Sequence, residues 1–319
     1  MSGPDQPPDE FGQIARLFRP LARGAPEALD LLDDAAVIPQ RPGFDLVVTK
    51  DAVVEGVHFP KGERPELIAR KLLRVNLSDL AAKAAEPWGY FLAVSWPPAA
   101  GWPARQAFAS GLATDGEAYG LTLLGGDTTS TPGPLTASVT MLGWVPAGAM
   151  VRRSGARPGD KLMVSGPIGD GWLGLRAALG ELDDPDGYLA GRYRLPEPRV
   201  DLRQALLDHA SAAADVSDGL IADAGHIAEA SGVGLRMDLD LAPLSDAARA
   251  WLDRQPDRAA ARLRLASGGD DYQVVCTAPA ADAHALGLTV IGEVTAEPGL
   301  AVVAGGERID PGPGGWRHA

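Results

Sequence analysis

Apolar runs of strand length alternate with helix-like patterns along nearly the whole chain, and this alternation is what most restricts its fold. Apolar residues at helical spacing predict helices over residues 65–85 and 103–119, and apolar runs predict strands over residues 89–96 and 135–145. The succession continues in the second half, for example from the run KLMVS into the helical pattern WLGLRAALG. A chain organised in this way is expected to fold as an α/β (α+β) protein rather than as a helical bundle or a β-sandwich.

A segment rich in Gly, Pro and Arg, residues 145–160, separates two complete runs of elements. The length of 319 residues also corresponds to about two domains. We therefore predict an amino-terminal domain over residues 1–148 and a carboxy-terminal domain over residues 149–319. Residues 1–10 are polar and Pro-rich, and they are predicted to form a mobile tail.

Acidic residues outnumber basic residues by 42 to 29, which gives a formal net charge of −13. Because nucleic-acid binding needs clustered Lys and Arg, this balance argues against nucleic acid as a partner. The single cysteine, Cys276, excludes an internal disulfide, and its apolar surroundings in YQVVCTAP predict a buried strand residue. The chain begins with no secretory signal pattern and has no stretch of 18 consecutive apolar residues, so we expect a cytoplasmic protein without a membrane partner.

Most of the acidic excess is aspartate, with 29 Asp against 13 Glu, and several of these Asp residues share one local pattern. An apolar run is followed by Asp, mostly beside Gly, Ser or Thr, in LLDDAAVI, VVTKDAVVEGVHF, NLSDLAA, LLGGDTTS, ADVSDGL and SGGDDYQ. Helix capping explains any one of these segments. Capping does not explain the apolar runs, which predict buried strands that carry their terminal carboxylates to one sheet edge, where α/β proteins bind ligands.

A cluster of carboxylates needs cations, because two like charges 4 Å apart repel by about 4 kcal/mol at an effective dielectric constant near 20. Hard oxygen ligands without His or Cys favour Mg²⁺, Mn²⁺ or Ca²⁺ over zinc. The chain contains no EF-hand loop, and Mg²⁺ held by a few carboxylates is normally completed by substrate phosphates. The sequence therefore predicts a Mg²⁺ site for a phosphate compound.

The usual phosphate-binding motifs are absent, because the chain has neither a P-loop nor the protein-kinase motif set. The segment GPIGDG, which begins at Gly166, has its glycines in the wrong order for a dinucleotide fingerprint and is predicted to be a tight turn between a strand and a helix. Gly125 and Gly126 are better placed, because two residues without Cβ let a phosphate approach backbone N–H groups.

Taken in order, the motifs resemble those of the thiamine-monophosphate kinase family, within the PurM-like (aminoimidazole ribonucleotide synthetase-like) ATP-binding superfamily. The resemblance rests on FGQIARLF, DDAAVI, TKDAVVEGVHF, NLSDLAA, LLGGDTTS, RRSGARPGD, SGPIGD, DVSDGLIAD, SGGDDYQ and GGWRH. It implies direct, in-line transfer of the γ-phosphoryl group of ATP to thiamine monophosphate, assisted by several Mg²⁺ ions. It also implies a two-domain PurM-like fold and a homodimer in which the amino-terminal sheets join into a barrel.

The resemblance assigns roles to individual residues. It implies metal ligands at Asp33, Thr49, Lys50, Asp51, Asp79, Asp127, Asp215 and Asp218. It implies ATP contacts at Gly126, Asp127, Arg153 and Ser217, and contacts to thiamine monophosphate at His58, Asp270 and Trp316. No residue is assigned as a general base, because the acceptor is an already ionised phosphate oxygen.

Three positions depart from the usual pattern of the family. Lys50 stands where many members have a hydroxyl residue that helps to bind metal, so one ligand is in doubt and the ammonium group could instead contact a phosphate. Leu32 replaces a usual Gly before the first pair of Asp residues. Asp270 replaces a common Glu, which shortens the reach toward the thiamine by one methylene.

Some of these residues also have simpler interpretations. His58 has apolar neighbours in the sequence and is compatible with a core histidine. Asp79 is compatible with an ion pair to Lys83 one turn along a helix, and Trp316 is compatible with plain packing. Arg153 is chosen over its neighbour only by the register of the motif.

Two alternative functions remain open at this point. A purine-biosynthetic synthetase of the same superfamily would carry similar metal and nucleotide turns, although EGVHF and GGWRH argue against it. A non-catalytic acidic metal-binding protein would explain the carboxylates, but it would not explain the ordered ATP-type motifs.

Overall fold

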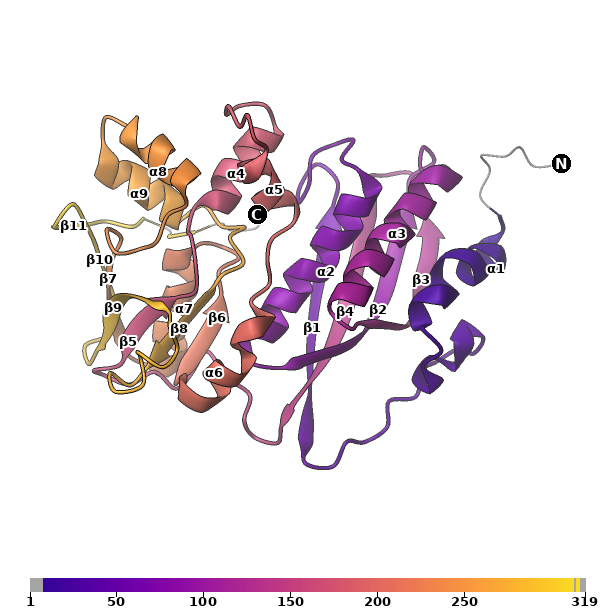
Figure 1. The fold of residues 1–319 in the computed structure, drawn as a ribbon, viewed down its shortest axis with the longest axis horizontal. Helices are drawn as coiled ribbons and strands as arrows, with labels where there is room; N and C mark the ends of the chain where they lie inside the picture. Colours follow the sequence, from indigo (N-terminus) through magenta and orange to yellow (C-terminus); the bar gives the residue numbers. More distant parts are fainter. Residues whose placement is uncertain (1–7, 313, 316–319) are drawn as a thin grey trace. The chain divides into compact units, whose positions relative to one another are not determined.

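The computed structural model describes residues 8–312, 314 and 315 of the chain. The chain divides into two compact units. Unit 1 comprises residues 1–80 and 86–148, and unit 2 comprises residues 81–85 and 149–319. Each unit contains a β-sheet flanked by helices (Figure 1), so the predicted α/β (α+β) class is confirmed.

Unit 1 begins with a short helical region and continues with alternating strands and long helices. The first region consists of α1 (Glu10–Gln13), a π-helical segment (Ile14–Phe18) and two 3₁₀ segments (Arg19–Ala22 and Pro26–Leu31). The elements that follow are β1 (Phe44–Val54), α2 (Pro65–Ala82), β2 (Glu86–Trp96), α3 (Trp102–Ala118), β3 (Thr122–Ser130) and β4 (Thr136–Pro146).

The unit 1 sheet has the strand order β1-β4-β2-β3. β4 is antiparallel to both β1 and β2, whereas β3 is parallel to β2. Helices α2 and α3 cover one face of this sheet (Figure 1). The side of the sheet turned away from these helices, which we call the open face, carries the exposed side chains of Val48, Lys50, Ala52, Ala93 and Asp127.

A buried ion cluster fixes α2 against α3. The carboxylate of Asp115, on α3, is fully buried and accepts hydrogen bonds from Arg70 Nε at 2.9 Å and Arg74 Nε at 2.6 Å, both on α2. Charge-assisted bonds of this kind are the strong ones, and the two partly exposed arginines compensate the buried charge of Asp115. The cluster therefore sets the position of α2 above the sheet.

Unit 2 contains a seven-stranded sheet of order β11-β10-β7-β9-β5-β8-β6. Its strands are β5 (Lys161–Val164), β6 (Ala212–Asp215), β7 (Gly234–Asp238), β8 (Val274–Ala278), β9 (Thr289–Thr295), β10 (Gly299–Ala304) and β11 (Glu307–Ile309). Its helices are α4 (Asp170–Ala178), α5 (Tyr188–Arg194), α6 (Arg203–His209), α7 (Leu220–Ser231), α8 (Asp246–Asp253) and α9 (Arg258–Ala266), with a 3₁₀ turn at Val200–Leu202.

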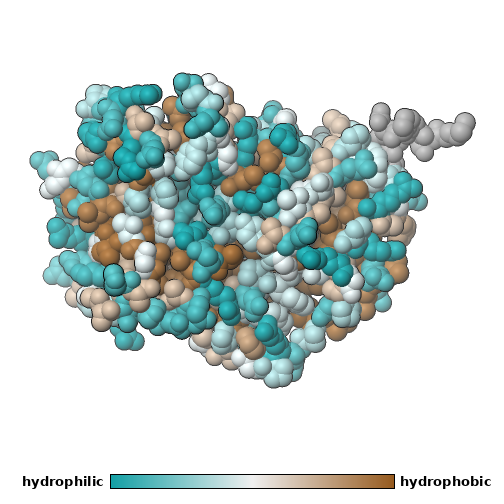
Figure 2. Space-filling view, viewed as in Figure 1, coloured by the Kyte–Doolittle hydropathy of each residue, from teal (hydrophilic) through white to brown (hydrophobic). Residues whose placement is uncertain are grey.

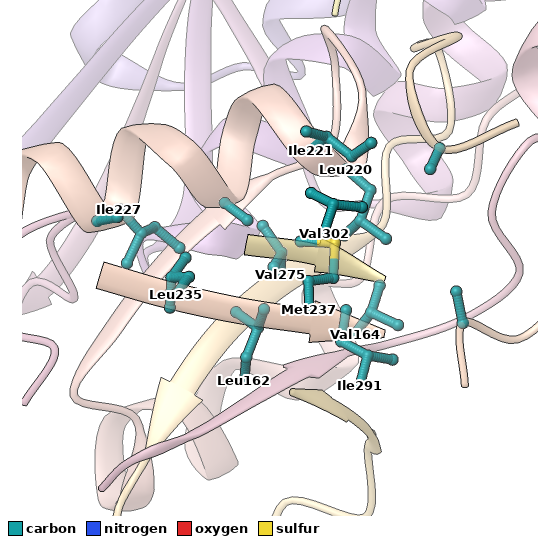
Figure 3. Close-up of a cluster of buried hydrophobic side chains, with 14 of the residues drawn as sticks. Leu162, Val164, Leu220, Ile221, Ile227, Leu235, Met237, Val275, Ile291 and Val302 are labelled. Carbon is teal, nitrogen blue, oxygen red and sulfur yellow. The ribbon is translucent and has the colours of Figure 1, made fainter. Parts of the chain in front are cut away.

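Apolar side chains cover both faces of the unit 2 sheet. On one face, Leu220 and Ile227 of α7 pack with strand residues such as Met237 and Val275 (Figure 3). On the other face, Cys276 packs in a cluster with Leu206 of α6. Cys276 is fully buried in β8, which confirms the interpretation of YQVVCTAP as a buried strand.

Polar and apolar side chains are interspersed on the molecular surface (Figure 2). Within the described part of the chain, no helix has the length and apolar character needed to span a membrane.

Two local predictions were wrong. The glycines of LLGGDTTS do not end a strand, because β3 continues through them to Ser130 and stays paired with β2. The carboxylates do not all follow strand ends either: Asp51 and Asp127 lie inside β1 and β3, Asp79 lies in α2, and Asp215 is the last residue of β6. The reason is that β1 pairs with β4 along its full length, so the polar residues of TKDAVV do not interrupt it.

Most of the predicted amino-terminal tail, residues 1–7, lies outside the described residues. Its last two residues do not belong to a tail. Glu10 is the first residue of α1, and Asp9 caps this helix by accepting a hydrogen bond from Gly12 N at 2.9 Å.

Candidate active site

A cluster of polar side chains lies between β1 and α2, and we call Thr49, Asp51 and Asp79 the carboxylate cluster. Thr49 and Asp51 project toward α2, because they pair with Met141 and Val139, which are fully buried under the helices. Thr49 Oγ1 donates a hydrogen bond to Asp79 Oδ2. Two residues of β1 and one residue of α2 thus share one small region, and the donor and acceptor atoms of their side chains are all oxygens.

The backbone beside this cluster is held by Asn76, which is fully buried on α2. Its Oδ1 accepts a hydrogen bond from Asp51 N at 3.1 Å, while its Nδ2 donates to Leu72 O at 2.8 Å. Asn76 therefore fixes the height of β1 relative to α2. Sequence reasoning missed this residue, although it lies three positions before Asp79 on the same helix.

The surroundings of Asp51 disfavour its ionised form. Burial, followed by the charge and a hydrogen bond of Asp79, raises the pKa of Asp51 to about 7. Two carboxylates close enough to raise a pKa in this way favour either a shared proton or a bound cation. The oxygen-only donor set fits a hard divalent cation such as Mg²⁺.

His58 lies directly after β1, is half-buried, and has a defined tautomer. Its Nδ1 accepts a hydrogen bond from Val54 N at 3.0 Å, so the neutral ring carries its proton on Nε2. Its carbonyl oxygen accepts from Lys71 Nζ at 3.2 Å. The ring is therefore oriented by its own turn as a hydrogen-bond donor through Nε2.

A cavity of about 370 Å³ lies at the other edge of the unit 1 sheet, and we call it the glycine pocket. Gly125, Gly126, Asp127 and Asp33 line one part of it, and apolar residues from the first helical region and the strands line the rest, including Ile14, Phe18, Phe91 and Leu123. Gly126 has a φ of +156°, and a Cβ atom there would collide with the backbone of Leu92. Only glycine fits, because the neighbouring strand approaches it closely. The close approach of a phosphate to Gly126 stays a prediction.

The turn before Asp33 accommodates Leu32 without strain. Leu32 has a φ of −109°, which any residue adopts, so no glycine is needed there. The unusual backbone lies earlier, at Leu29, Asp30 and Leu31, where φ is between +48° and +57°.

The two groups of unit 1 residues do not converge within one chain. Strand register puts Asp51, Val139, Leu92 and Gly126 in one row across β1, β4, β2 and β3, so the carboxylate cluster and the glycine pocket are at opposite edges of the sheet. The prediction that these carboxylates meet at one sheet edge is therefore wrong for unit 1 taken by itself.

In unit 2, Asp215, Ser217 and Asp218 form the turn between β6 and α7. The turn is organised by Asp223, whose side chain is buried and whose Oδ2 accepts hydrogen bonds from the N–H groups of Ser217, Asp218 and Gly219, each at 3.1 Å. Burial and then the charge of Asp218 raise the pKa of Asp223 to about 7.

Asp270 lies next to this turn. Asp270 N donates to Ser217 O at 2.9 Å, and Tyr272 N donates to Val216 O at 2.8 Å. Asp270 has a φ of +59°, which is uncommon for a residue with a side chain and often marks a functional loop. The structure thus brings the predicted unit 2 residues Asp215, Ser217, Asp218 and Asp270 together.

GPIGDG is the tight turn between a strand and a helix that the sequence predicted, and its N–H groups are already occupied. Asp271 is buried, and its carboxylate accepts hydrogen bonds at 2.9 Å from the N–H groups of Gly169 and Gly171, at the start of α4. The carboxyl group of Asp271 therefore occupies the position in which an external ligand would meet the N–H groups of this helix N-terminus.

Arg153 is exposed, and its positive charge counteracts the raised pKa of Asp223 beside the Ser217 turn. The choice of Arg153 over its neighbour stays a prediction. Sequence reasoning missed Asp223 and also His226, one turn further along α7. Ligand atoms of Asp218, Asp223 and His226 all lie within 4.8 Å of one another. Their spacing on one helix face was the signal that could have revealed them.

Trp316 lies outside the described residues. Its predecessor Gly315 packs closely against the backbone of Asp218 and the side chain of Ala222.

Family models and curated relatives cover nearly the whole chain. The model for the AIR synthase related protein, N-terminal domain, matches residues 32–145, and the model for the C-terminal domain matches residues 157–305. A thiamine-monophosphate kinase from Caulobacter vibrioides is 57% identical over 321 residues, covering 98% of this chain and 91% of the relative. The enzyme of the same name from Salmonella typhimurium is 40% identical over 286 residues, covering 88% and 86%.

Solved structures agree with this likeness. The thiamine-monophosphate kinase from Stenotrophomonas maltophilia superimposes with a TM-score of 0.82 at 39% identity, covering 94% of this chain and 98% of that one. The complex described as AaThiL with AMPPCP and TMP superimposes with a TM-score of 0.79 at 30% identity, covering 97% of both chains.

Proposed function

The chain belongs to the AIR synthase related family and, within it, to the thiamine-monophosphate kinases, and we propose on this premise that it transfers the γ-phosphoryl group of ATP to thiamine monophosphate, giving thiamine diphosphate and ADP. The observation that carries the assignment is the 57% identity to a thiamine-monophosphate kinase over nearly the full length of both chains. Such chemistry requires charge neutralisation and in-line positioning more than covalent help from the protein.

The carboxylates are proposed to hold several Mg²⁺ ions. The donors would be Asp33, Thr49, Asp51, Asp79, Asp127, Asp215 and Asp218, whose oxygens fit a hard cation. When bound, such ions neutralise the phosphates of ATP and of the acceptor, which would otherwise repel the acidic site. Thr49 would keep the Asp79 carboxylate oriented through its hydrogen bond. Lys50 is not counted among these donors, because an ammonium group donates hydrogen bonds and cannot ligate a cation; it would instead contact a phosphate.

The nucleotide contacts are proposed at Gly126, Asp127, Arg153 and Ser217. Gly126 lines a cavity with apolar walls, which suits a nucleotide whose phosphates lie near the glycines. Arg153 is always charged and offers a fork of donors to phosphate oxygens.

Thiamine monophosphate is proposed to contact His58, Asp270 and Trp316. His58 would donate from Nε2, because its Nδ1 is already engaged by Val54. The attacking phosphate oxygen is ionised and needs no base, so none of these residues has to accept a proton.

A homodimer is proposed for the open face of unit 1. β1 is an edge strand, and Leu46 and Val48 are 36% and 55% exposed on it. A long exposed edge with apolar side chains is a risk for aggregation unless another chain covers it.

We assign ATP and metal binding mainly to residues 1–148, with residues 149–319 as the second PurM-like domain. We place the enzyme in the cytoplasm, where ATP is available.

The test is direct. Purified protein incubated with ATP, Mg²⁺ and thiamine monophosphate is expected to form thiamine diphosphate and ADP, both measured by chromatography, and the Asp127→Ala variant is expected to be inactive. A Asp253→Ala variant is the matched control, because Asp253 is exposed on α8. Turnover of a formylglycinamidine substrate without turnover of thiamine monophosphate would instead favour a purine-biosynthetic synthetase.

A further inference from the structure

A second cavity of unit 1 is lined by residues that have no role in the proposed kinase site. It has a volume of about 230 Å³ and lies among the 3₁₀ segment Arg19–Ala22, strand β2 and the carboxy-terminal half of α3. Its buried walls include Leu21, Tyr90, Leu112 and Leu121, and we call it the tyrosine pocket. Among the described residues it shares no lining residue with the glycine pocket, so the two cavities are separate.

The hydroxyl group of Tyr90 lacks a partner in this pocket. Tyr90 is only 1% exposed, and its hydroxyl has no hydrogen-bond partner within residues 8–312, 314 and 315. The oxygen is not sealed inside the protein either, so it faces the pocket that Tyr90 lines. Burial raises the pKa of the phenol, and neither a charge nor a hydrogen bond contributes to this shift. Because a buried tyrosine hydroxyl normally has a partner, the open space of the pocket is where that partner belongs.

The walls of the pocket do not supply this partner. The three leucine side chains have no polar atom, and the carbonyl oxygen of Gly116 already accepts hydrogen bonds from Leu121 N at 2.8 Å and from Arg23 Nη1 at 3.2 Å. A buried water is held by several polar groups, whereas a water beside Tyr90 would be surrounded by leucine side chains. A ligand that has one acceptor and an apolar body suits these surroundings better.

The size and the charges of the pocket narrow the class of ligand. An engineered apolar cavity of about 150 Å³ binds benzene, so a volume of about 230 Å³ admits one ring with a short substituent. Arg23 and Glu117, which are both exposed, add one positive and one negative charge to the lining, so the pocket has no net charge that selects an ion. An ionised group next to Tyr90 would lose its hydration without gaining a counter-charge, and the ligand is therefore neutral.

We propose that the tyrosine pocket is a second ligand site of the chain, which binds a neutral compound with an apolar body of one ring and one hydrogen-bond acceptor. The acceptor, a carbonyl oxygen or a ring nitrogen, takes the hydrogen bond that Tyr90 Oη donates. The ring lies against the leucine side chains. The site is independent of the proposed kinase function, because no residue that lines the pocket has a role in phosphoryl transfer.

Acetophenone is the probe, because it has one ring, one carbonyl acceptor and no hydrogen-bond donor. Its binding to the purified full-length protein is measured by saturation-transfer NMR and by titration. A dissociation constant of about 1 mM is expected for a ligand of this size. No binding at millimolar concentrations overturns the proposal and means that the pocket holds solvent only.

Filling the pocket locates the probe. A Cβ atom at Gly116 would have its nearest neighbour, Leu121 O, at 3.6 Å, so the side chain of a Gly116→Leu variant can enter the pocket without a collision. This variant is expected to lose acetophenone binding. Gly191→Leu is the matched control, because Gly191 lies on α5 and a Cβ there has no neighbour within 4 Å. Equal binding to Gly116→Leu and wild type would place the probe elsewhere and overturn the proposal.

Removing one oxygen tests the hydrogen bond. Tyr90→Phe is expected to weaken acetophenone binding about fivefold, the effect of one neutral hydrogen bond. Its melting temperature should equal or exceed that of the wild type, because the free protein loses no bond. Tyr188→Phe is the control with the opposite pattern: Tyr188 Oη donates to Asp170 at 2.8 Å, so this variant should melt at a lower temperature and bind acetophenone like the wild type. Wild-type affinity in Tyr90→Phe contradicts the assigned role of the hydroxyl and overturns the proposed ligand class.

Discussion

The acidic residues of unit 1 and unit 2 are held in place in two different ways. In unit 1, Asp51 and Asp79 lie on regular elements, and sheet register and helix packing set their positions. In unit 2, Asp218 and Asp270 lie on turns that are organised by two other acids, Asp223 and Asp271, whose buried oxygens accept backbone N–H groups. Aspartates with the same chemistry thus fall into two groups: those proposed to bind metal ions and those whose oxygens hold backbone turns. Their hydrogen-bond partners separate the two groups better than the sequence does.

The largest effect is expected from the ligand-serving acids of unit 1. Asp51→Asn and Asp79→Asn should each lower kcat/KM by about 10³-fold, since a preorganised charge in a partly buried site is lost. The free energy of unfolding should stay equal or rise for Asp51→Asn, because burial and Asp79 disfavour the ionised form. Measurement needs an ADP-release assay and urea unfolding. A strong loss of stability with retained activity would place Asp51 among the structural acids instead.

Asp115 is the structural acid of unit 1, and its loss should have the largest effect on stability. Asp115→Ala leaves Arg70 and Arg74 without their buried partner and should cost about 3–5 kcal/mol of unfolding free energy. Asp253→Ala is the matched control, because Asp253 pairs with Arg258 on the surface and should cost less than about 1 kcal/mol. Equal costs in urea unfolding would show that burial does not distinguish the two pairs.

Asp223 should show a smaller loss that extends to ligand binding. Asp223→Ala removes the acceptor of three N–H groups in the turn that carries Ser217, and it should cost about 1–3 kcal/mol. The KM for ATP should rise at the same time, because the turn is then free to move. Asp223→Asn keeps an acceptor oxygen and should lose less of both. If only stability falls in Asp223→Ala, Ser217 is not held by this turn for nucleotide binding.

Much of the fold could be predicted from the sequence, because alternating strand and helix patterns are local signals. Unit 1 and unit 2 differ in how much of the candidate site could be predicted from the sequence. Asp215, Ser217, Asp218 and Asp270 lie on short turns next to strands, where apolar run and polar turn are adjacent in the sequence, and the structure brings them together as predicted.

In unit 1 the same reasoning failed. The strand order β1-β4-β2-β3 separates β1 from β3, and strand order is a property of long-range pairing that no local pattern contains. The structural acids were recognised only in part. Asp271 is one of two Asp residues that the sequence leaves as a capping or supporting residue, and the structure confirms that it accepts N–H groups at the start of α4. Asp223 was missed, because only its bonds to backbone N–H groups show its role.

The smallest change in unfolding free energy, counted per pH unit, is expected from the titration of Asp271. Burial raises the pKa of Asp271 from 3.8 to about 8, and the charges of Asp170 and Asp270 add to the rise, while the N–H groups of Gly169 and Gly171 lower it. The folded protein then holds a proton that the unfolded chain has released, so this contribution to stability is complete below about pH 4 and is lost as the pH rises through about 8.

The slope from one such group is at most about 1.4 kcal/mol per pH unit. Asp271→Asn removes the titrating proton, so its unfolding free energy should depend less on pH than that of the wild type between about pH 5 and pH 8. Asp246→Asn serves as the control, because the side chain of Asp246 is fully exposed. Parallel pH profiles of wild type and Asp271→Asn would mean that Asp271 is ionised in the folded state. The hydrogen bonds from the two N–H groups of the GPIGDG turn would then offset the cost of burying the charge of Asp271. In that case Asp271 would be ionised, as we propose for the metal-binding acids of unit 1.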